Sequence, residues 1–132
     1  MLAALPLLVI VVLAYNVLAF TAPASIGQAV WSGHLASGAD FTATVGDMLV
    51  GLGVLLLYFE ILKATRFSAR SMANQFLSMA LFVVALVQFL LLPQFGTSTF
   101  FIIMLVCFVD VVAGFTVAVA TAKRDISLGN AN

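Results

Sequence analysis

Two carboxylates stand where an ionisable side chain could do chemistry inside a membrane. Asp110 lies near the middle of a long apolar run, and Glu60 lies near the end of another, three residues before Lys63. A charge at the centre of a bilayer costs at least about 2.5 to 3.5 kcal/mol, so Asp110 has a partner, carries a proton or faces water. It is therefore either an ion or proton site or a buried hydrogen-bonding group that fixes helix register. For Glu60, an ion pair with Lys63 is the favoured interpretation, and a functional role is the alternative.

Two amides could join these carboxylates. Helical rise, counted from the expected inner ends of the apolar runs, puts Asn16 at nearly the depth of Asp110, with Gln88 a little nearer the outside. An amide that donates to a carboxylate at this depth would link two helices. The sequence thus predicts an intramembrane polar cluster of Asp110, Asn16, Gln88 and Glu60.

Residues 42–47, "TATVGD", resemble the selectivity filter of the potassium-channel superfamily. Such a filter needs a pore helix before it and a second small residue after it. Here a glycine-rich loop precedes the motif, and Met48 stands where the second glycine belongs. The pattern favours a helix start, with Thr44 or Thr42 as the cap and Asp47 in the first turn, where the helix dipole stabilises a carboxylate.

The sequence lacks the residue patterns that metal binding, phosphate binding or nucleophilic catalysis would require. The sequence has one histidine, His34, one cysteine, Cys107, and no phosphate-binding loop, zinc-type His pair or nucleophile elbow. We therefore expect no enzyme activity, no catalytic residues, no metal and no cofactor. His34 is expected to be exposed or hydrogen-bonded, and metal binding or proton sensing is the alternative. Five basic residues are too few to indicate a nucleic-acid partner.

The elements that carry these side chains follow from hydrophobicity. Of 132 residues, 64% are hydrophobic and 8% are charged, which excludes a soluble domain with a polar surface. Apolar runs cover residues 2–20, 46–62, 72–92 and 98–122, and a bilayer span needs about 20 residues. We expect an all-α polytopic membrane protein with four transmembrane helices in one domain, residues 1–132, in contact with the lipid bilayer. A secretory signal is the alternative for the first run, but the run is long and no basic residue precedes it.

The basic residues predict the orientation. They fall in two segments, one after the second run and one after the fourth: Lys63, Arg66, Arg70, Lys123 and Arg124. Four spans put both segments on one side, which the positive-inside rule assigns to the cytoplasm. We therefore expect a multi-pass protein of the bacterial inner membrane with both termini cytoplasmic.

The segment between the first two runs, residues 21–45, is expected outside. Ile26, Val30 and Leu35 recur at roughly helical spacing in it. This spacing predicts a short amphipathic helix in the outer interface, with Trp31 at the level of the lipid headgroups and His34 nearby.

Small residues mark expected helix contacts. Gly46 and Gly53 share one face of the second run, and Gly114 and Ala118 follow Asp110 along one face of the fourth. Small side chains let helix backbones approach closely, so both stripes are expected to be packing surfaces. The opposite face of the fourth run is expected to contact lipid through Phe101, Phe108 and Phe115.

Residues 55–63, "LLLYFEILK", are similar to the phosphate-starvation-inducible PsiE family of small bacterial inner-membrane proteins. The likeness consists of "LYFE" at residues 57–60, four spans, a long outer first loop and a basic inner loop. It implies the four-span topology and puts Glu60 at the family's aromatic-Phe-Glu position.

Two classes of function remain. The favoured one is a non-catalytic interaction protein, either a homo-oligomer or an accessory subunit that binds other membrane-protein subunits. The alternative is a small ion or proton transporter or channel that uses Asp110 with Glu60, which four short helices could form only as an oligomer.

Overall fold

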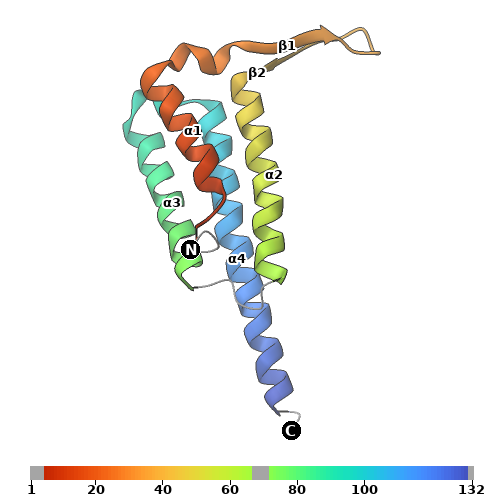
Figure 1. Ribbon diagram of the computed structural model, residues 1–132, viewed down its shortest axis with the longest axis vertical. Helices are drawn as coiled ribbons and strands as arrows, with labels where there is room; N and C mark the ends of the chain where they lie inside the picture. The colour runs from red at the N-terminus through yellow and green to blue at the C-terminus, as the bar shows by residue number, and fades with distance from the viewer. Residues whose placement is uncertain (1–4, 67–71, 131–132) are drawn as a thin grey trace.

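The fold is a bundle of four α-helices with a β-hairpin at one end (Figure 1). The computed structural model describes residues 5–66 and 72–130, and this part of the chain is mostly helical. In chain order the elements are α1 (Leu8–Thr21), the 3-10 helix η2 (Pro23–Gly27), β1 (Ala29–His34), β2 (Asp40–Thr44), α2 (Val45–Arg66), α3 (Met72–Leu91), the 3-10 helix η3 (Pro93–Phe95) and α4 (Ser98–Asn130). The expected helical fold is present, together with a small sheet that the sequence did not predict.

Three helices are long and apolar enough to cross a membrane, over Val45–Ala64, Met72–Leu91 and Ser98–Arg124. This composition is consistent with a membrane protein. The fourth expected span is shorter, because α1 has 14 residues and covers about 21 Å by helical rise, against a hydrocarbon core of about 30 Å. Residues 2–4 of the expected first span and Arg70 of the basic loop lie outside the described residues.

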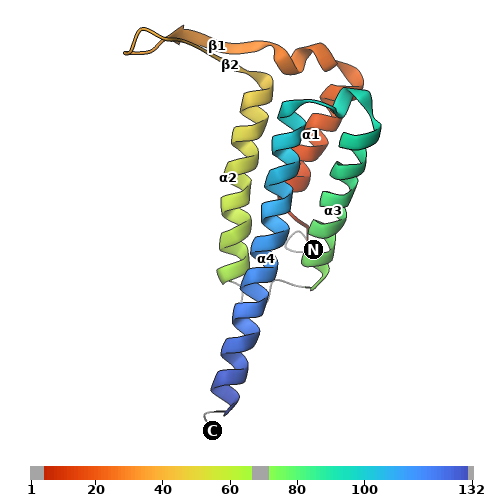
Figure 2. The same ribbon diagram turned by 180° about the vertical axis from the view of Figure 1, so that it is seen from behind.

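The helices alternate in direction. We call the end of the bundle that bears the hairpin the outer end and the opposite end the inner end (Figures 1 and 2). Helices α2 and α4 run side by side from the outer to the inner end, since Gly46 lies beside Thr99 and Gly53 lies beside Val106. Val11 of α1 also lies beside Gly53, so Val11, Gly53 and Val106 mark one common level in the bundle.

The core lies between α1, α4 and the short helix η3. Tyr15 of α1 packs on Phe95 and Phe100, with ring centroids 5.4 and 4.8 Å apart. These three side chains are fully buried. Large apolar side chains also cover the outside of the bundle, as expected for helices that contact lipid. Phe101, Phe108 and Phe115 are 42–47% exposed, which agrees with their predicted position on the outer surface of α4.

The segment before α2 differs from the expectation of an amphipathic helix. Only Pro23–Gly27 is helical, as one 3-10 helix, and β1 and β2 form an antiparallel hairpin. The reason is the alternation of side chains: apolar and polar residues exchange every second position through Phe41–Thr44, which suits a strand, and Gly38 adopts φ +89° in the connecting turn. The hairpin extends sideways from the outer end of α2 (Figures 1 and 2).

Candidate functional site

Glu60 is a buried polar side chain of the bundle's inner half that contacts both Leu7 and Lys63. It is completely buried, and its Oε1 accepts a hydrogen bond from the backbone amide of Leu7 over 2.5 Å. The same oxygen lies 3.3 Å from Lys63 Nζ, which also donates to the carbonyl oxygen of Leu5 over 3.2 Å. The predicted ion pair of Glu60 with Lys63 is therefore confirmed. The contact with Leu7 was not predicted, because these residues are 53 positions apart.

This contact explains where α1 begins. The first amides of a helix have no partner within the helix, and a buried one needs an acceptor from elsewhere. Leu7 is the N-cap residue of α1 and offers no side-chain cap. The Glu60 carboxylate supplies the acceptor, and a negative charge at a helix N-terminus is favourable. Glu60 thus acts as a cap provided by a different helix.

Asp110 is 1% exposed and points into the bundle from α4. It lies four residues inward of Val106, while Glu60 lies seven residues inward of Gly53 on the parallel helix α2. The level of Asp110 is thus about 4.5 Å outward from that of Glu60 along the bundle axis. Two buried carboxylates therefore occupy neighbouring levels on adjacent helices.

Helix α3 adds polar side chains at this depth that sequence reasoning missed. Asn74 and Ser78 are buried and stand one turn apart on one face of α3. Gln75 Nε2 donates to the carbonyl oxygen of Val111 over 3.2 Å, which places this part of α3 beside the Asp110 turn of α4. We call Glu60, Asn74, Ser78 and Asp110 the inner polar level. The i, i+4 spacing of Asn74 and Ser78 within an apolar run is the signal that could have identified them.

The two amides of the predicted cluster lie elsewhere. Asn16 and Gln88 exchange hydrogen bonds, with Nδ2 to Oε1 at 3.3 Å and Nε2 to Oδ1 at 2.6 Å. Asn16 lies five residues outward of Val11, so its level is about 13 Å outward from that of Asp110. The predicted cluster is thus divided into an outer amide pair and the inner polar level. The depth assigned from the sequence differs because α1 begins at Leu8, within the bundle, and not at its inner end.

A second outer polar contact was not predicted. The Tyr15 hydroxyl lies 2.7 Å from Thr97 Oγ1 and donates to the carbonyl oxygen of Gln94 over 3.2 Å. Thr97 Oγ1 in turn accepts from the backbone amide of Phe100 over 3.1 Å, so it caps α4. The outer polar groups therefore join α1 to the start of α4.

The glycine stripe of α2 contains one close contact and one looser contact. A Cβ atom at Gly46 would lie 2.8 Å from Thr99 Oγ1 and 3.2 Å from Thr99 Cγ2, which is too close. At Gly53 it would meet Val11 and Val106 at 3.8 and 3.9 Å, which is ordinary contact. Along α4, Gly114 is buried, whereas Ala118 is exposed.

The residues "TATVGD" form the end of β2 and the first turn of α2. Thr44 Oγ1 accepts from the amide of Asp47 over 3.1 Å, and Asp47 Oδ2 accepts from the amide of Thr44 over 3.0 Å. This reciprocal pair is a capping box. The predicted cap by Thr44 and the predicted position of Asp47 are both confirmed.

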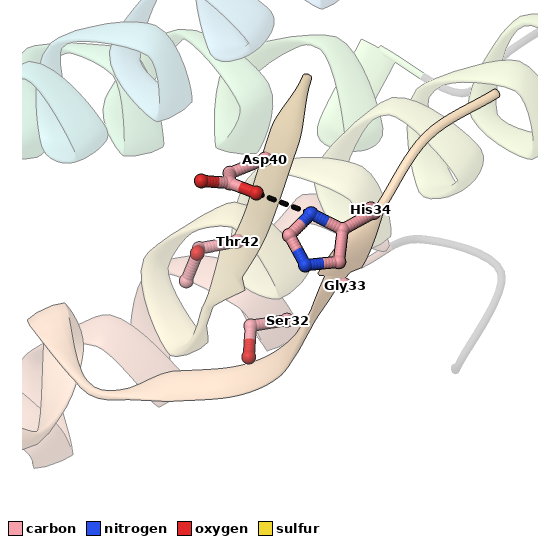
Figure 3. A pocket seen from close by; sticks show the side chains of 5 residues that line it. All are labelled: Ser32, Gly33, His34, Asp40 and Thr42. Carbon is pink, nitrogen blue, oxygen red and sulfur yellow. Dashed lines mark ion pairs between the residues drawn. The ribbon is translucent and has the colours of Figure 1, made fainter. Parts of the chain in front are cut away.

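His34 lies on the polar face of the hairpin (Figure 3). Its Nδ1 is 2.5 Å from Asp40 Oδ1, and the two side chains are 81% and 82% exposed. With Ser32 and Thr42 they line a shallow, open pocket. Within residues 5–66 and 72–130, no three His, Cys, Asp or Glu side chains are grouped as a metal site would require.

Comparison with known proteins gives no relative: no family model, curated protein or solved structure matches the chain.

Proposed function

We propose that this chain is a small non-catalytic integral protein of the bacterial inner membrane that acts by assembly, as a homo-oligomer or as an accessory subunit of a larger membrane complex. The main support for this proposal is that the inner part of α4 extends beyond the level at which α2 ends. By the register of Gly53 with Val106, the end of α2 at Arg66 is level with residue 119, and α4 continues to Asn130. Residues 120–130 extend beyond the other helices (Figures 1 and 2).

A partner surface would stabilise this extension. Its described side chains are exposed, and they include Ile126 at 64%. About three helical turns whose described side chains are exposed are only marginally stable in water. Burial of Ile126 against a second copy or another subunit would add apolar contacts that stabilise this segment.

The contacts of the buried Glu60 and the half-buried Asn16 and Gln88 support a non-catalytic role. The Glu60 carboxylate binds the start of α1, and Asn16 and Gln88 bind each other. These side chains join helices, which is the usual role of polar groups in membrane bundles.

The proposed orientation follows the basic residues. Lys63 of α2 and the pair Lys123 and Arg124 of α4 belong to the inner ends of parallel helices. The positive-inside rule then assigns the inner end to the cytoplasm and the hairpin to the outside. The likeness to the PsiE family supports this topology, and membership of that family is part of the proposal.

Native mass spectrometry in a mild detergent tests the assembly proposal. We expect the wild type to appear as a multiple of the 13.9 kDa chain or with stoichiometric partner subunits. Ile126→Glu should release single chains, and Ser127→Glu, a control one position away on another face of the helix, should not. A wild type that is a single chain without partners in every mild detergent and in nanodiscs would contradict the proposal.

A small ion or proton transporter is the second candidate. It is favoured by the inner polar level, where Asp110 and Glu60 are buried about one helical turn apart in depth. A carboxylate pair at such a depth can bind and release a cation or proton. This activity would also require an oligomer.

A further inference from the structure

The hairpin has two chemically different faces. Directly paired residues of antiparallel strands share a face, and β1 pairs Trp31 with Ala43 and Gly33 with Phe41. The Trp31 ring lies over Gly33, where a Cβ atom would be 2.8 Å from the ring. Its centroid is 5.8 Å from that of Phe41. One face is therefore aromatic and carries no charge.

The opposite face is polar (Figure 3). Here Ser32 pairs with Thr42, and His34 pairs with Asp40. His34 and Asp40 are the only ionisable side chains of the two strands, and they contact each other. The hairpin is thus amphipathic across its thickness.

The position of the hairpin is set by its connection to α2. Strand β2 ends at Thr44 and α2 begins at Val45, without an intervening loop, and the capping box of Thr44 and Asp47 holds this junction. The stretch that can span a membrane also begins at Val45. The hairpin then runs away from the bundle, across the direction of the helix axes (Figures 1 and 2). It therefore lies at the level where α2 would leave the hydrocarbon.

The aromatic face has no cover from the described part of the chain. Trp31 is 53% exposed and Phe41 is 45% exposed. A two-stranded hairpin alone is at best marginally stable in water, so it requires another surface against its apolar side. In the first turn of α2, next to the hairpin, Met48 is 49% exposed and is the first of the exposed apolar side chains of that helix.

We propose that the aromatic face of the hairpin is seated on the outer surface of the lipid bilayer, at the level of the headgroups. Lipid surrounds a spanning helix at this depth, and the hairpin extends sideways over it. Trp is the side chain that prefers this zone, because its ring is apolar and its N–H remains wet. The polar face, with His34 and Asp40, then faces water. This inference rests on the proposed membrane insertion and orientation, and it is independent of the assembly proposed for α4.

The charge of the hairpin indicates which lipid feature it recognises. The two strands contain no Lys or Arg, and the nearest further charge is the acidic Asp47. Attraction of anionic headgroups requires basic residues. Binding therefore depends on burial of the aromatic face, and neutral phosphatidylcholine suffices.

Trp31 is the only tryptophan of the chain, so its fluorescence reports on this face alone. The wild type is reconstituted in phosphatidylcholine vesicles that carry bromine either close to the headgroup or deep in the acyl chains. Shallow bromine should quench Trp31 about twofold more than deep bromine, and aqueous iodide should quench it weakly, because Trp prefers the interface. Addition of phosphatidylglycerol should leave these ratios unchanged.

Two variants on adjacent positions of β2 serve as a matched pair. Phe41→Ser should make Trp31 more accessible to iodide, whereas Thr42→Ala on the polar face should leave quenching as in the wild type. Strong iodide quenching without bromine quenching in the wild type would show that the face is in water and overturn the proposal. Weak quenching by both agents would also overturn it. If quenching by both agents is weak and increases on dilution to one copy per nanodisc, a second copy of the chain covers the aromatic face.

Discussion

The carboxylate of Glu60 on α2 accepts a hydrogen bond from the backbone amide of Leu7, at the start of α1, over 2.5 Å. The Lys63 ammonium, one turn later on α2, binds the carbonyl oxygen of Leu5. The buried Pro6 lies between these two anchor points. The inner end of α2 therefore fixes the point at which the chain enters α1.

Removal of this cap should destabilise the bundle. In Glu60→Ala, the Leu7 amide and the Lys63 ammonium lose a buried acceptor, and we expect a loss of about 2–4 kcal/mol in the free energy of unfolding. Glu60→Gln should cost less, since an amide oxygen can still accept from Leu7. Reversible unfolding in mixed detergent micelles measures both.

Leu55→Ala is the control for this series, because Leu55 is on the same helix and 61% exposed. A Glu60→Ala variant as stable as Leu55→Ala would contradict the capping role.

The three glycines of α2 should respond differently to alanine. At Gly46 a Cβ atom would lie 2.8 and 3.2 Å from the two γ atoms of Thr99 and 3.2 Å from Ile26 Cγ2, so at least one of these neighbours must shift. We expect Gly46→Ala to cost about 1–3 kcal/mol through overpacking. Gly53→Ala should be tolerated. A Cβ atom at Gly51 would meet no described residue beyond its own helix within 4 Å, so Gly51→Ala should be neutral or stabilise by up to about 1 kcal/mol through helix propensity.

The same unfolding assay ranks these three variants. Equal stabilities of Gly46→Ala and Gly51→Ala would show that α2 and α4 are not in close contact at Thr99.

Sequence reasoning succeeded where the relevant contacts are local. The cap of α2 by Thr44, the ion pair of Glu60 with Lys63 and the three long apolar helices depend on residues within a few positions of each other. Periodicity and cap chemistry report such contacts directly. The outward position of Phe108 follows from the same rule.

The failures have two physical causes. In the segment before α2, the spacing of Ile26, Val30 and Leu35 predicts a helix, whereas the alternation through Phe41–Thr44 and the turn at Gly38 favour the observed hairpin. The depths of Asn16 and Asp110 were counted from the ends of apolar runs. A contact between distant residues, Glu60 with Leu7, anchors the true start of α1. Pro6, directly before the N-cap, is the local signal for this start.

Cysteine accessibility tests the proposed orientation. Cys107 is buried, so a membrane-impermeant thiol reagent should not label the wild type in intact vesicles. Ser37→Cys, in the hairpin turn, should be labelled from the periplasmic side, and Ser127→Cys, in the extension of α4, only from the cytoplasmic side. The reverse pattern would contradict the proposed orientation. Labelling of both positions from the same side would contradict three membrane crossings between residues 37 and 127.

Ion and proton flux in liposomes tests the central claim, that the buried polar groups join helices and do not carry a substrate. The wild type and Asp110→Asn are reconstituted at equal density, and their oligomer size is measured in the same preparations. An amide keeps the shape and hydrogen bonding of Asp110 but cannot bind and release a proton. We predict flux no greater than that of empty liposomes for both proteins, with unchanged assembly. Flux through the wild type that disappears in a normally assembled Asp110→Asn variant would contradict the account and identify a transporter.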